Sequence, residues 1–329
     1  MNSSHISRRT AMAVAAAFGT GVFNHAIAQT KHLSLIVPQP AGNPTDGTAR
    51  KLQPILQREL NQIVVVENVP GAGGSLGMRK ALQAPVEAPM LVITSQTEPI
   101  LTPLAIAGAK YKAEDFRAVA LVARAPYVLV GRPDLPANSL AELIELARRS
   151  ADKPLSHGHI GQGSMIHLLG EQFSRKTGVA LTHVAYRGVP PVVQDLMGGQ
   201  IDLAFLPLGG STPTLVESGK VRAYGVTASA PSGRLPKLQA LAAQDQRLSG
   251  FVYGTWAAVL VSRAIPEAAV RRFHQSLATA LKDPDVQAHT VASGLEPAAW
   301  MSLAQLDHFY QEETRLYEAM VREIGVTPQ

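Results

Sequence analysis

Short apolar runs alternate with segments of helical periodicity along the first third of the chain. The apolar run 33–37 is typical of a strand covered on both faces, and 62–68 and 90–95 are predicted as further strands. Residues 47–60 repeat their apolar positions at helical spacing, and 75–84 predict a second, shorter helix. Alternating strands and helices predict an α/β fold with an open parallel sheet and right-handed crossovers.

Two long apolar segments interrupt this alternation. Residues 116–133 and 250–266 are strand-like throughout and contain no helical period. We interpret them as crossover strands that join two Rossmann-like α/β domains with a cleft between them. The predicted domains are residues 29–124 plus 254–329, and residues 125–253.

The stretch between the two long segments repeats the strand and helix pattern. A helix is predicted over 139–150, with Ser139 as its N-cap and Glu142 completing a capping box. The predicted strands are 155–160, 181–186, 201–207 and 221–227, with a helix over 165–176 that Ser164 can cap. The tail from Glu267 onward is predicted to be mostly helical.

Residues 1–28 have the three parts of a secretory signal peptide. A polar, basic start with Arg8 and Arg9 precedes a short apolar stretch, and Ala26-Ile27-Ala28 fits a cleavage site before Gln29. The paired arginines leave both the general (Sec) and the twin-arginine (Tat) export routes open. We expect a soluble, periplasmic protein.

Composition and charge narrow the classes of partner. The chain has no cysteine, which excludes disulfides and thiolate metal sites. The net charge is +5. The basic residues are interspersed with acidic residues and form no basic block or stripe. This distribution argues against nucleic-acid binding and is compatible with a small anionic ligand.

The loop 38–46 raises the first question about function, because it follows a predicted strand and precedes a helix. Ligands of open parallel sheets bind beyond the carboxyl ends of the strands. Ala41 and Gly42 leave room for a ligand to approach the backbone, and the start of a helix offers free N–H groups to an anion. The helix could be capped by Asn43, Thr45 or Asp46. Asp46 either caps the helix or contacts a ligand, and an ordinary Pro/Gly turn is the plain alternative.

Comparable loops follow other predicted strands. Three of them, 70–75, 95–97 and 158–164, are rich in glycine, serine, threonine or glutamine. The fourth, 186–191, carries Tyr186 and Arg187. Because the carboxyl ends of parallel strands share an edge, these loops predict a polar cleft with many backbone donors.

These motifs together resemble one known family. VPQPAGNPTDGTAR, VVVENVPGAGGSLGMRKAL, SHGHIGQGSMIHLLGEQF and HVAYRGVPPVVQDLMGGQIDLAF are similar, in order along the chain, to segments of the Bug, or TctC-like, extracytoplasmic receptors. The resemblance implies a type 2 periplasmic-binding-protein fold and a small carboxylate ligand. It also implies, as partners, the membrane subunits of a tripartite tricarboxylate transporter or a sensor kinase.

The resemblance further implies which residues hold the ligand. Backbone N–H groups of two loops grip the carboxylate in the family, and an acid lies beside it. The corresponding positions here are Ala41, Gly42, Thr45 and Asp46 in the first loop, and Gly161, Gln162, Gly163 and Ser164 in the second. The full predicted ligand-binding set adds Asn43, Ser95, Thr97, His159, Tyr186, Arg187 and Asp202.

The sequence departs from the family pattern at several positions. Asn43 stands where a second glycine is usual, and His159-Ile160 replaces smaller residues. Glu87-Ala88-Pro89 replaces the usual Asp-Gly-Tyr. The identity of the ligand therefore does not carry over from a relative.

A secreted serine hydrolase is the alternative function. Gly73-Gly74-Ser75-Leu76-Gly77 matches the nucleophile-elbow pattern and lies between a strand and a helix. Asp195 or Asp202, followed by His289 or His308, would complete the order of a triad. Further glycines flank the motif and no oxyanion-type motif accompanies it, so we favour a plain Gly-rich turn.

A metal site is a second alternative. His157 and His159 alternate on one strand, and His167 and Glu171 share a helix face. Nothing in the sequence brings the two pairs together, so we predict neither metal nor cofactor. The sequence therefore predicts a monomeric receptor, not an enzyme, that captures a small di- or tricarboxylate, amino acid or aromatic acid between two domains.

Overall fold

Strand β1 (Leu33–Val37) is fully buried and lies between β2 (Val64–Asn68) and β3 (Leu91–Ser95), parallel to both. Helices α1 (Pro44–Leu60) and α2 (Ser75–Leu82) connect the three strands. This confirms the predicted alternation of strands and helices. The computed structural model describes residues 32–325, so the predicted signal peptide lies outside the described residues.

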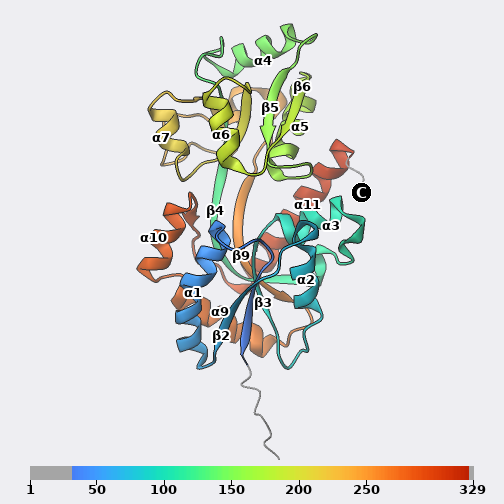
Figure 1. The fold of residues 1–329 in the computed structure, drawn as a ribbon, viewed down its shortest axis with the longest axis vertical. Coiled ribbons are helices and arrows are strands. Elements are labelled where there is room, and N and C mark those ends of the chain that lie inside the picture. Colours follow the sequence, from blue (N-terminus) through green and yellow to red (C-terminus); the bar gives the residue numbers. More distant parts are fainter. Residues whose placement is uncertain (1–31, 326–329) are drawn as a thin grey trace, which may run out of the picture. The chain divides into compact units, whose positions relative to one another are not determined.

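Two long strands run through the middle of the structure (Figure 1). β4 (Phe116–Gly131) pairs antiparallel with β9 (Gly254–Ser262) along its first part, and strands β2, β1, β3, β9 and this part of β4 form the first half-sheet. Along its last part β4 pairs antiparallel with β7 (Leu203–Pro207) and β8 (Arg222–Val226), which belong to a second half-sheet. The prediction of long extended segments is confirmed. The predicted parallel sheet is formed by β1, β2 and β3, and β9 joins it antiparallel to both β3 and β4.

The second half-sheet consists of β7 (Leu203–Pro207), β5 (Leu155–His159), β6 (Leu181–Ala185) and β8 (Arg222–Val226). β5 is parallel to β6 and β7. The accompanying helices are α4 (Leu140–Arg149), α5 (Met165–Thr177), α6 (Val189–Met197) and α7 (Thr212–Glu217). The overall strand order is β2-β1-β3-β9-β4-β7-β5-β6, with β8 and β10 (Glu296–Pro297) both paired to β4.

The remaining helices are α3 (Thr102–Ala105), α8 (Leu241–Gln244), α9 (Glu267–Ala280), α10 (Pro284–Ala292) and α11 (Leu303–Ile324). The tail is therefore mostly helical, as predicted. Buried Tyr310 and Tyr317 on α11 belong to a core that extends into both half-sheets, with Val92 of β3 in the first and Phe205 of β7 in the second. The division into two domains stays a prediction, because residues 32–329 form one compact unit by their contacts. Within the described part of the chain, no helix combines the length and apolarity needed to cross a membrane.

Helix starts show how local chemistry sets the element boundaries. Asn43 caps α1, with its Oδ1 accepting from Asp46 N at 3.0 Å, so α1 begins at Pro44 rather than at the predicted Gly47. Ser139 caps α4 as predicted, but the Glu142 carboxylate accepts from Asn138 N rather than from the cap residue. The predicted capping box is thus only half formed.

Candidate functional site

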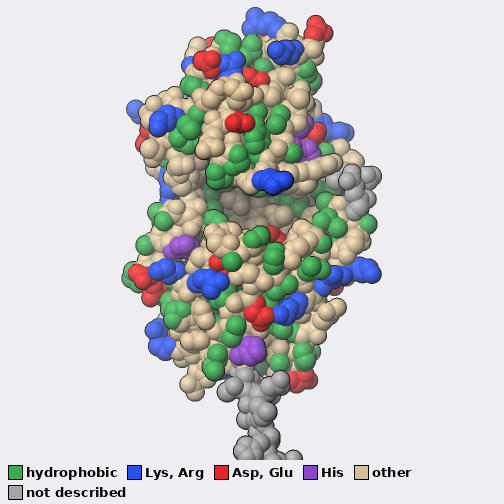
Figure 2. Space-filling model, viewed as in Figure 1, with side chains coloured by type: hydrophobic (Ala, Val, Ile, Leu, Met, Phe, Trp, Pro, Cys, Tyr) green, Lys and Arg blue, Asp and Glu red, His purple; other side chains and the backbone are tan. Residues whose placement is uncertain are grey.

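A cavity of about 590 Å³ opens where loops of the two half-sheets face each other. Figure 2 shows a hollow at this level of the molecule. The first half-sheet and its loops contribute Gln39, Gly73, Ser95, Gln96, Thr97, Glu98, Leu101, Thr102, Ala105, Ile106 and Thr255 to the lining. The second contributes Tyr127, Ile160, Gln162, Gly163, Ser164, Met165, Ile166, Val189 and Pro207. We call this cavity the cleft pocket.

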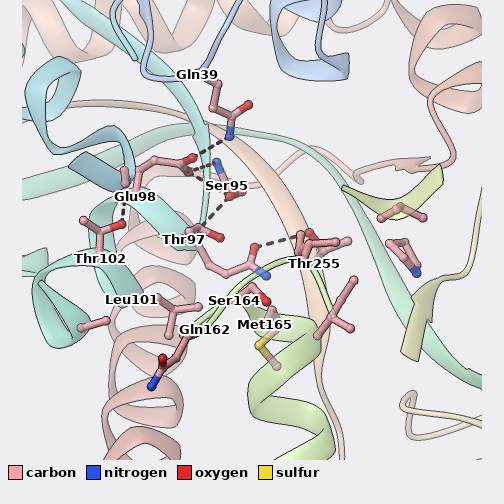
Figure 3. A pocket seen from close by; sticks show the side chains of 18 of the residues that line it. Gln39, Ser95, Thr97, Glu98, Leu101, Thr102, Gln162, Ser164, Met165 and Thr255 are labelled. Carbon is pink, nitrogen blue, oxygen red and sulfur yellow. Dashed lines mark hydrogen bonds between the residues drawn. The ribbon is translucent and has the colours of Figure 1, made fainter. Parts of the chain in front are cut away.

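Glu98 organises one wall of the cleft pocket (Figure 3). Its side chain is buried, and its Oε2 accepts from Thr94 Oγ1 at 2.6 Å and from Ser95 Oγ at 3.0 Å. Its Oε1 accepts from Gln39 Nε2 at 2.6 Å. Both carboxylate oxygens are therefore engaged within the protein, and the acid ties the loop after β1 to the end of β3.

Gln96 links the same wall to strand β9. Its Nε2 donates to Gly254 O at 3.3 Å, and its Oε1 accepts from Trp256 N at 3.2 Å. The side chain is almost fully buried. Gly254 and Trp256 lie on β9, which pairs with β4. The Gln96 amide therefore holds this wall of the pocket to the centre of the sheet.

The Gly-rich loop before α5 forms the opposite wall. Ser164 caps α5 as predicted: its Oγ accepts from His167 N at 3.3 Å and donates to Gly161 O at 2.7 Å. The backbone N–H groups of Gln162, Met165 and Ile166 have no hydrogen-bond partner among the described residues, and all three residues line the pocket. Free N–H groups at a helix start favour a bound anion.

The charge of the lining decides how an anion could be held. Among the described residues of the lining, only Glu98 is ionisable apart from the Tyr127 phenol, and none is a lysine, arginine or histidine. The hydroxyl of Thr97 and the amide of Gln162 have no side-chain hydrogen bond among the described residues, and both lie at the cavity in Figure 3. Neutral dipoles, not a salt bridge, are the donors that this pocket offers.

The ligand contacts predicted in loop 38–46 do not line the cleft pocket. None of Ala41, Gly42, Asn43, Thr45 and Asp46 lines the cleft pocket. Asp46 is buried; its Oδ2 accepts from Gly42 N at 2.8 Å, and its Oδ1 lies 3.0 Å from Arg50 Nη2. Burial alone would raise the pKa of Asp46, but the bonds from Gly42 and Arg50 outweigh it and lower that pKa. Asp46 therefore holds the loop against α1, and Asn43 is the cap.

Other predicted residues also lie outside the lining. Arg187 is exposed, and the Tyr186 hydroxyl donates to Asp195 Oδ2 at 2.7 Å. Burial, followed by the Asp195 carboxylate, raises the pKa of Tyr186 to about 12. Asp202 accepts from Ser156 N and from Arg132 Nε, at 2.8 and 2.9 Å. Ser95, Thr97, Gln162, Gly163 and Ser164 are the predicted residues that the structure brings together around the cavity.

The arrangement does not support the hydrolase alternative. Ser75 is buried, and its Oγ has no hydrogen-bond partner within residues 32–325. His289 Nε2 instead lies 3.4 Å from Pro44 O and Ser293 Oγ, while Asp195 and Asp202 are engaged by Tyr186 and Ser156. Without a base beside it, Ser75 is the ordinary turn serine that we favoured.

Four histidines gather behind the Gly-rich loop. His157 and His159 are on β5, His183 is on β6 and His167 is on α5. The ring centroids of His159 and His167 lie 4.6 Å apart, and those of His167 and His183 lie 4.9 Å apart. Burial, followed by the neighbouring imidazoles, lowers the pKa of His167 to about 4, and burial also lowers the pKa values of the other three. His159 and Gly161 thus lie behind the wall and not in the lining.

Comparison with known proteins now identifies the family. The family model described as the tripartite tricarboxylate transporter family receptor matches residues 48–326. The chain belongs to this receptor family. Its members are solute-binding receptors, which agrees with the prediction that the chain is not an enzyme.

Individual relatives of this receptor agree with the family assignment. It is 30% identical over 295 residues to a protein encoded between ttuE and ttuC' in Agrobacterium vitis, covering 89% of this chain and 84% of the relative. The solved periplasmic binding protein BugD is 29% identical, with a TM-score of 0.72 over 91% of this chain and 99% of BugD. The fold class of a periplasmic binding protein is thereby confirmed.

Two related receptors were solved with ligands. A protein of R. palustris with adipate is 27% identical, with a TM-score of 0.74 over 91% of this chain and 98% of its own. MatC from Rhodopseudomonas palustris, with bound malate, is 26% identical, with a TM-score of 0.71 over 88% of this chain and 98% of its own.

Sequence reasoning missed several lining residues. Gln39, Gln96, Glu98, Thr102, Tyr127 and Thr255 line the cavity but were not predicted. Glu98 lies one residue beyond the predicted loop 95–97, so extending that loop by one residue would have included it. Tyr127 and Thr255 lie within long apolar segments and carry no comparable local signal.

Proposed function

We propose that this receptor binds a small dicarboxylate in the cleft pocket, in the periplasm, and delivers it to the membrane subunits of a tripartite tricarboxylate transporter or to a sensor. The observation that carries the proposal is the set of free backbone N–H groups at Gln162, Met165 and Ile166, beside a helix start and facing a cation-free cavity. Such donors stabilise a carboxylate without the strong desolvation cost of a buried ion pair.

The size and polarity of the cavity support a small ligand. A volume of about 590 Å³ is within the range of small-molecule sites. Apolar side chains of Leu101, Ile106 and Met165 line it beside the hydroxyl and amide groups, which suits a short aliphatic chain between polar ends. Adipate and malate, the ligands of two related receptors, have this chemistry.

Ligand binding is expected to raise the thermal stability of the protein. The full chain is unfolded and refolded to remove any carried-over ligand and is then heated with adipate or malate. A ligand at a hundred times its dissociation constant should add about 2.7 kcal/mol to the free energy of unfolding. The uncharged diamides of the same acids are the matched controls and should cause little shift. Equal shifts with acid and diamide, or none with a wider panel of carboxylates, would contradict the proposal.

The Thr97 hydroxyl provides a local test of where the ligand lies. Replacing Thr97 with valine keeps the side-chain volume but removes a hydroxyl that has no partner of its own in the described structure. Losing one neutral hydrogen bond should weaken binding of the active carboxylate about 3- to 10-fold, measured by calorimetry. Thr279→Val on α9, outside the lining, is the control and should bind as the wild type does. Equal affinity of T97V and wild type would place the ligand elsewhere.

A further inference from the structure

Three histidines and one acid converge beside the cleft pocket without lining it. His159 ends β5, His183 lies on β6, and His167 and Glu171 occupy successive turns of α5. One ligand atom from each of these histidines lies within 4.8 Å of the others. We call His159, His167, His183 and Glu171 the histidine cluster.

The chain topology explains why the sequence did not show this cluster. β5 and β6 are parallel neighbours, with His157 opposite His183 in the register. α5 connects the two strands and starts at Met165, after the short loop that follows His159. Residues 24 positions apart in the chain thus become neighbours, and His183 enters a set that the sequence alone could not complete.

The distances to Glu171 fit the edges of a tetrahedral site. Glu171 Oε1 lies 3.2 Å from His183 Nε2 and 3.6 Å from His167 Nε2. Zinc bonds of about 2.0–2.1 Å imply ligand-to-ligand edges of about 3.4 Å. The ligand atoms of the three histidines lie within 4.8 Å of one another, a looser spacing than these edges, so a metal ion would draw the side chains together.

Outer contacts bear on which nitrogen of each ring can bind a metal. His183 Nδ1 lies 3.4 Å from His157 Nδ1, and His159 Nδ1 lies 2.9 Å from Gly161 O. His159 Nδ1 also accepts from Gly161 N at 3.2 Å, and this contact has to open when Nδ1 carries the proton. When Nδ1 carries the proton and donates to such a partner, Nε2 keeps its lone pair for a metal. His157 is fully buried and backs His183 from the core.

His167 must change one contact to take part. Its Nδ1 accepts from Gly163 N at 3.3 Å. Ligation through Nε2 places the proton on Nδ1, so this contact has to open. Gly163 lines the cleft pocket. The hydrogen bond from Gly163 to His167 therefore links the histidine cluster to the Gly-rich wall.

The donor chemistry selects the kind of ion. Imidazole nitrogens with one carboxylate suit zinc and other divalent transition metals, whereas calcium and magnesium prefer oxygen ligands. The Glu171 side chain is 36% exposed, which leaves a route from solvent. On the face drawn in Figure 2, histidine lies beside an acidic side chain in the region of α5 and β6.

We propose that the histidine cluster is a binding site for one divalent transition metal ion, with a three-nitrogen, one-oxygen ligand set. This inference goes beyond the proposed carboxylate function and departs from the sequence prediction of no metal. The alternative is that no metal binds and Glu171 accepts hydrogen bonds from His167 and His183. The experiment below distinguishes these two arrangements.

The test is calorimetric titration of the full chain with zinc chloride, after chelator treatment and purification without a polyhistidine tag. One Zn²⁺ per chain should bind, and the melting temperature should rise. Cobalt substituted for zinc should show the intense visible absorption of tetrahedral Co²⁺. No binding by the wild type would overturn the proposal.

Variants assign the binding to this cluster. Glu171→Gln and His183→Asn should each weaken zinc binding by about tenfold or more, since even outer partners of metal ligands contribute about 10- to 100-fold. His308→Asn on α11 removes a histidine outside the cluster and should leave zinc binding unchanged. If His183→Asn fails to fold by circular dichroism, the half-exposed Glu171→Gln decides. Wild-type affinity in Glu171→Gln would overturn the proposed ligand set.

Discussion

Replacing Glu98 with alanine is expected to lower the free energy of unfolding by about 3 kcal/mol and to remove carboxylate binding. The carboxylate receives hydrogen bonds from Thr94, Ser95 and Gln39, and Thr94 is fully buried. A buried donor left without its acceptor costs about 1–3 kcal/mol, and the Thr94 hydroxyl would be left in that position, whereas Ser95 and Gln39 line the cavity. Urea denaturation measures the stability, and calorimetry measures the binding.

Two further variants make the Glu98 result interpretable. Glu98→Gln keeps the volume and one acceptor oxygen, so it should lose less stability than Glu98→Ala. Glu145→Ala removes an exposed acid of α4 whose ion pair with Arg149, at 3.8 Å, lies on the surface, and it should change stability by under about 1 kcal/mol. If Glu98→Ala were as stable as Glu145→Ala, the described network would not support the pocket wall.

Replacing Asp202 with alanine is expected to lower the free energy of unfolding by about 3 kcal/mol but to leave carboxylate affinity unchanged. Asp202 precedes β7, and its carboxylate accepts from Ser156 N and Oγ on β5, both at 2.8 Å, and from Arg132 after β4. Removing it leaves half-buried donors of Ser156 and Arg132 unpaired. Denaturation at neutral pH measures the stability, and calorimetry on the folded variant measures the affinity. Weakened binding with unchanged stability would instead make Asp202 a ligand contact, as the sequence predicted.

The contribution of Asp202 should also depend on pH in a defined direction. Burial opposes its ionisation, but the bonds from Ser156 and Arg132 outweigh burial and lower the pKa below the ordinary value of 3.8. A carboxyl whose pKa is lowered by folding stabilises the protein above its unfolded pKa, and this stabilisation is lost as the pH falls through the folded value. The stability difference between wild type and Asp202→Ala should therefore be full at neutral pH and shrink only below about pH 4. A difference that already fades near pH 6 would point to a histidine instead.

Local sequence patterns predicted the secondary structure well because their causes are local. The buried run 33–37, the long segment 116–131 and the caps at Ser139 and Ser164 each depend on residues close in the chain. The family resemblance added the expected fold and an expected class of ligand. The Gly-rich loop was predicted as part of the site for the same reason, since its small residues and its following helix start are contiguous.

Only the tertiary structure decided which polar groups remain free. Asp202 looks like a ligand contact in the sequence, yet its carboxylate is engaged by Ser156 and Arg132, which only folding brings near. Asp46 is engaged by Gly42 and Arg50, each four residues away, so in its case the competing contacts are local. Glu98 and the completed histidine cluster became visible only through the pairing of β5 with β6 and the packing of loops from both half-sheets. The sequence determined the elements and the family, because helix caps and apolar runs act over a few residues. The site depended on contacts between distant segments, and a hydrogen-bond donor is available to a ligand only if no such contact has already satisfied it.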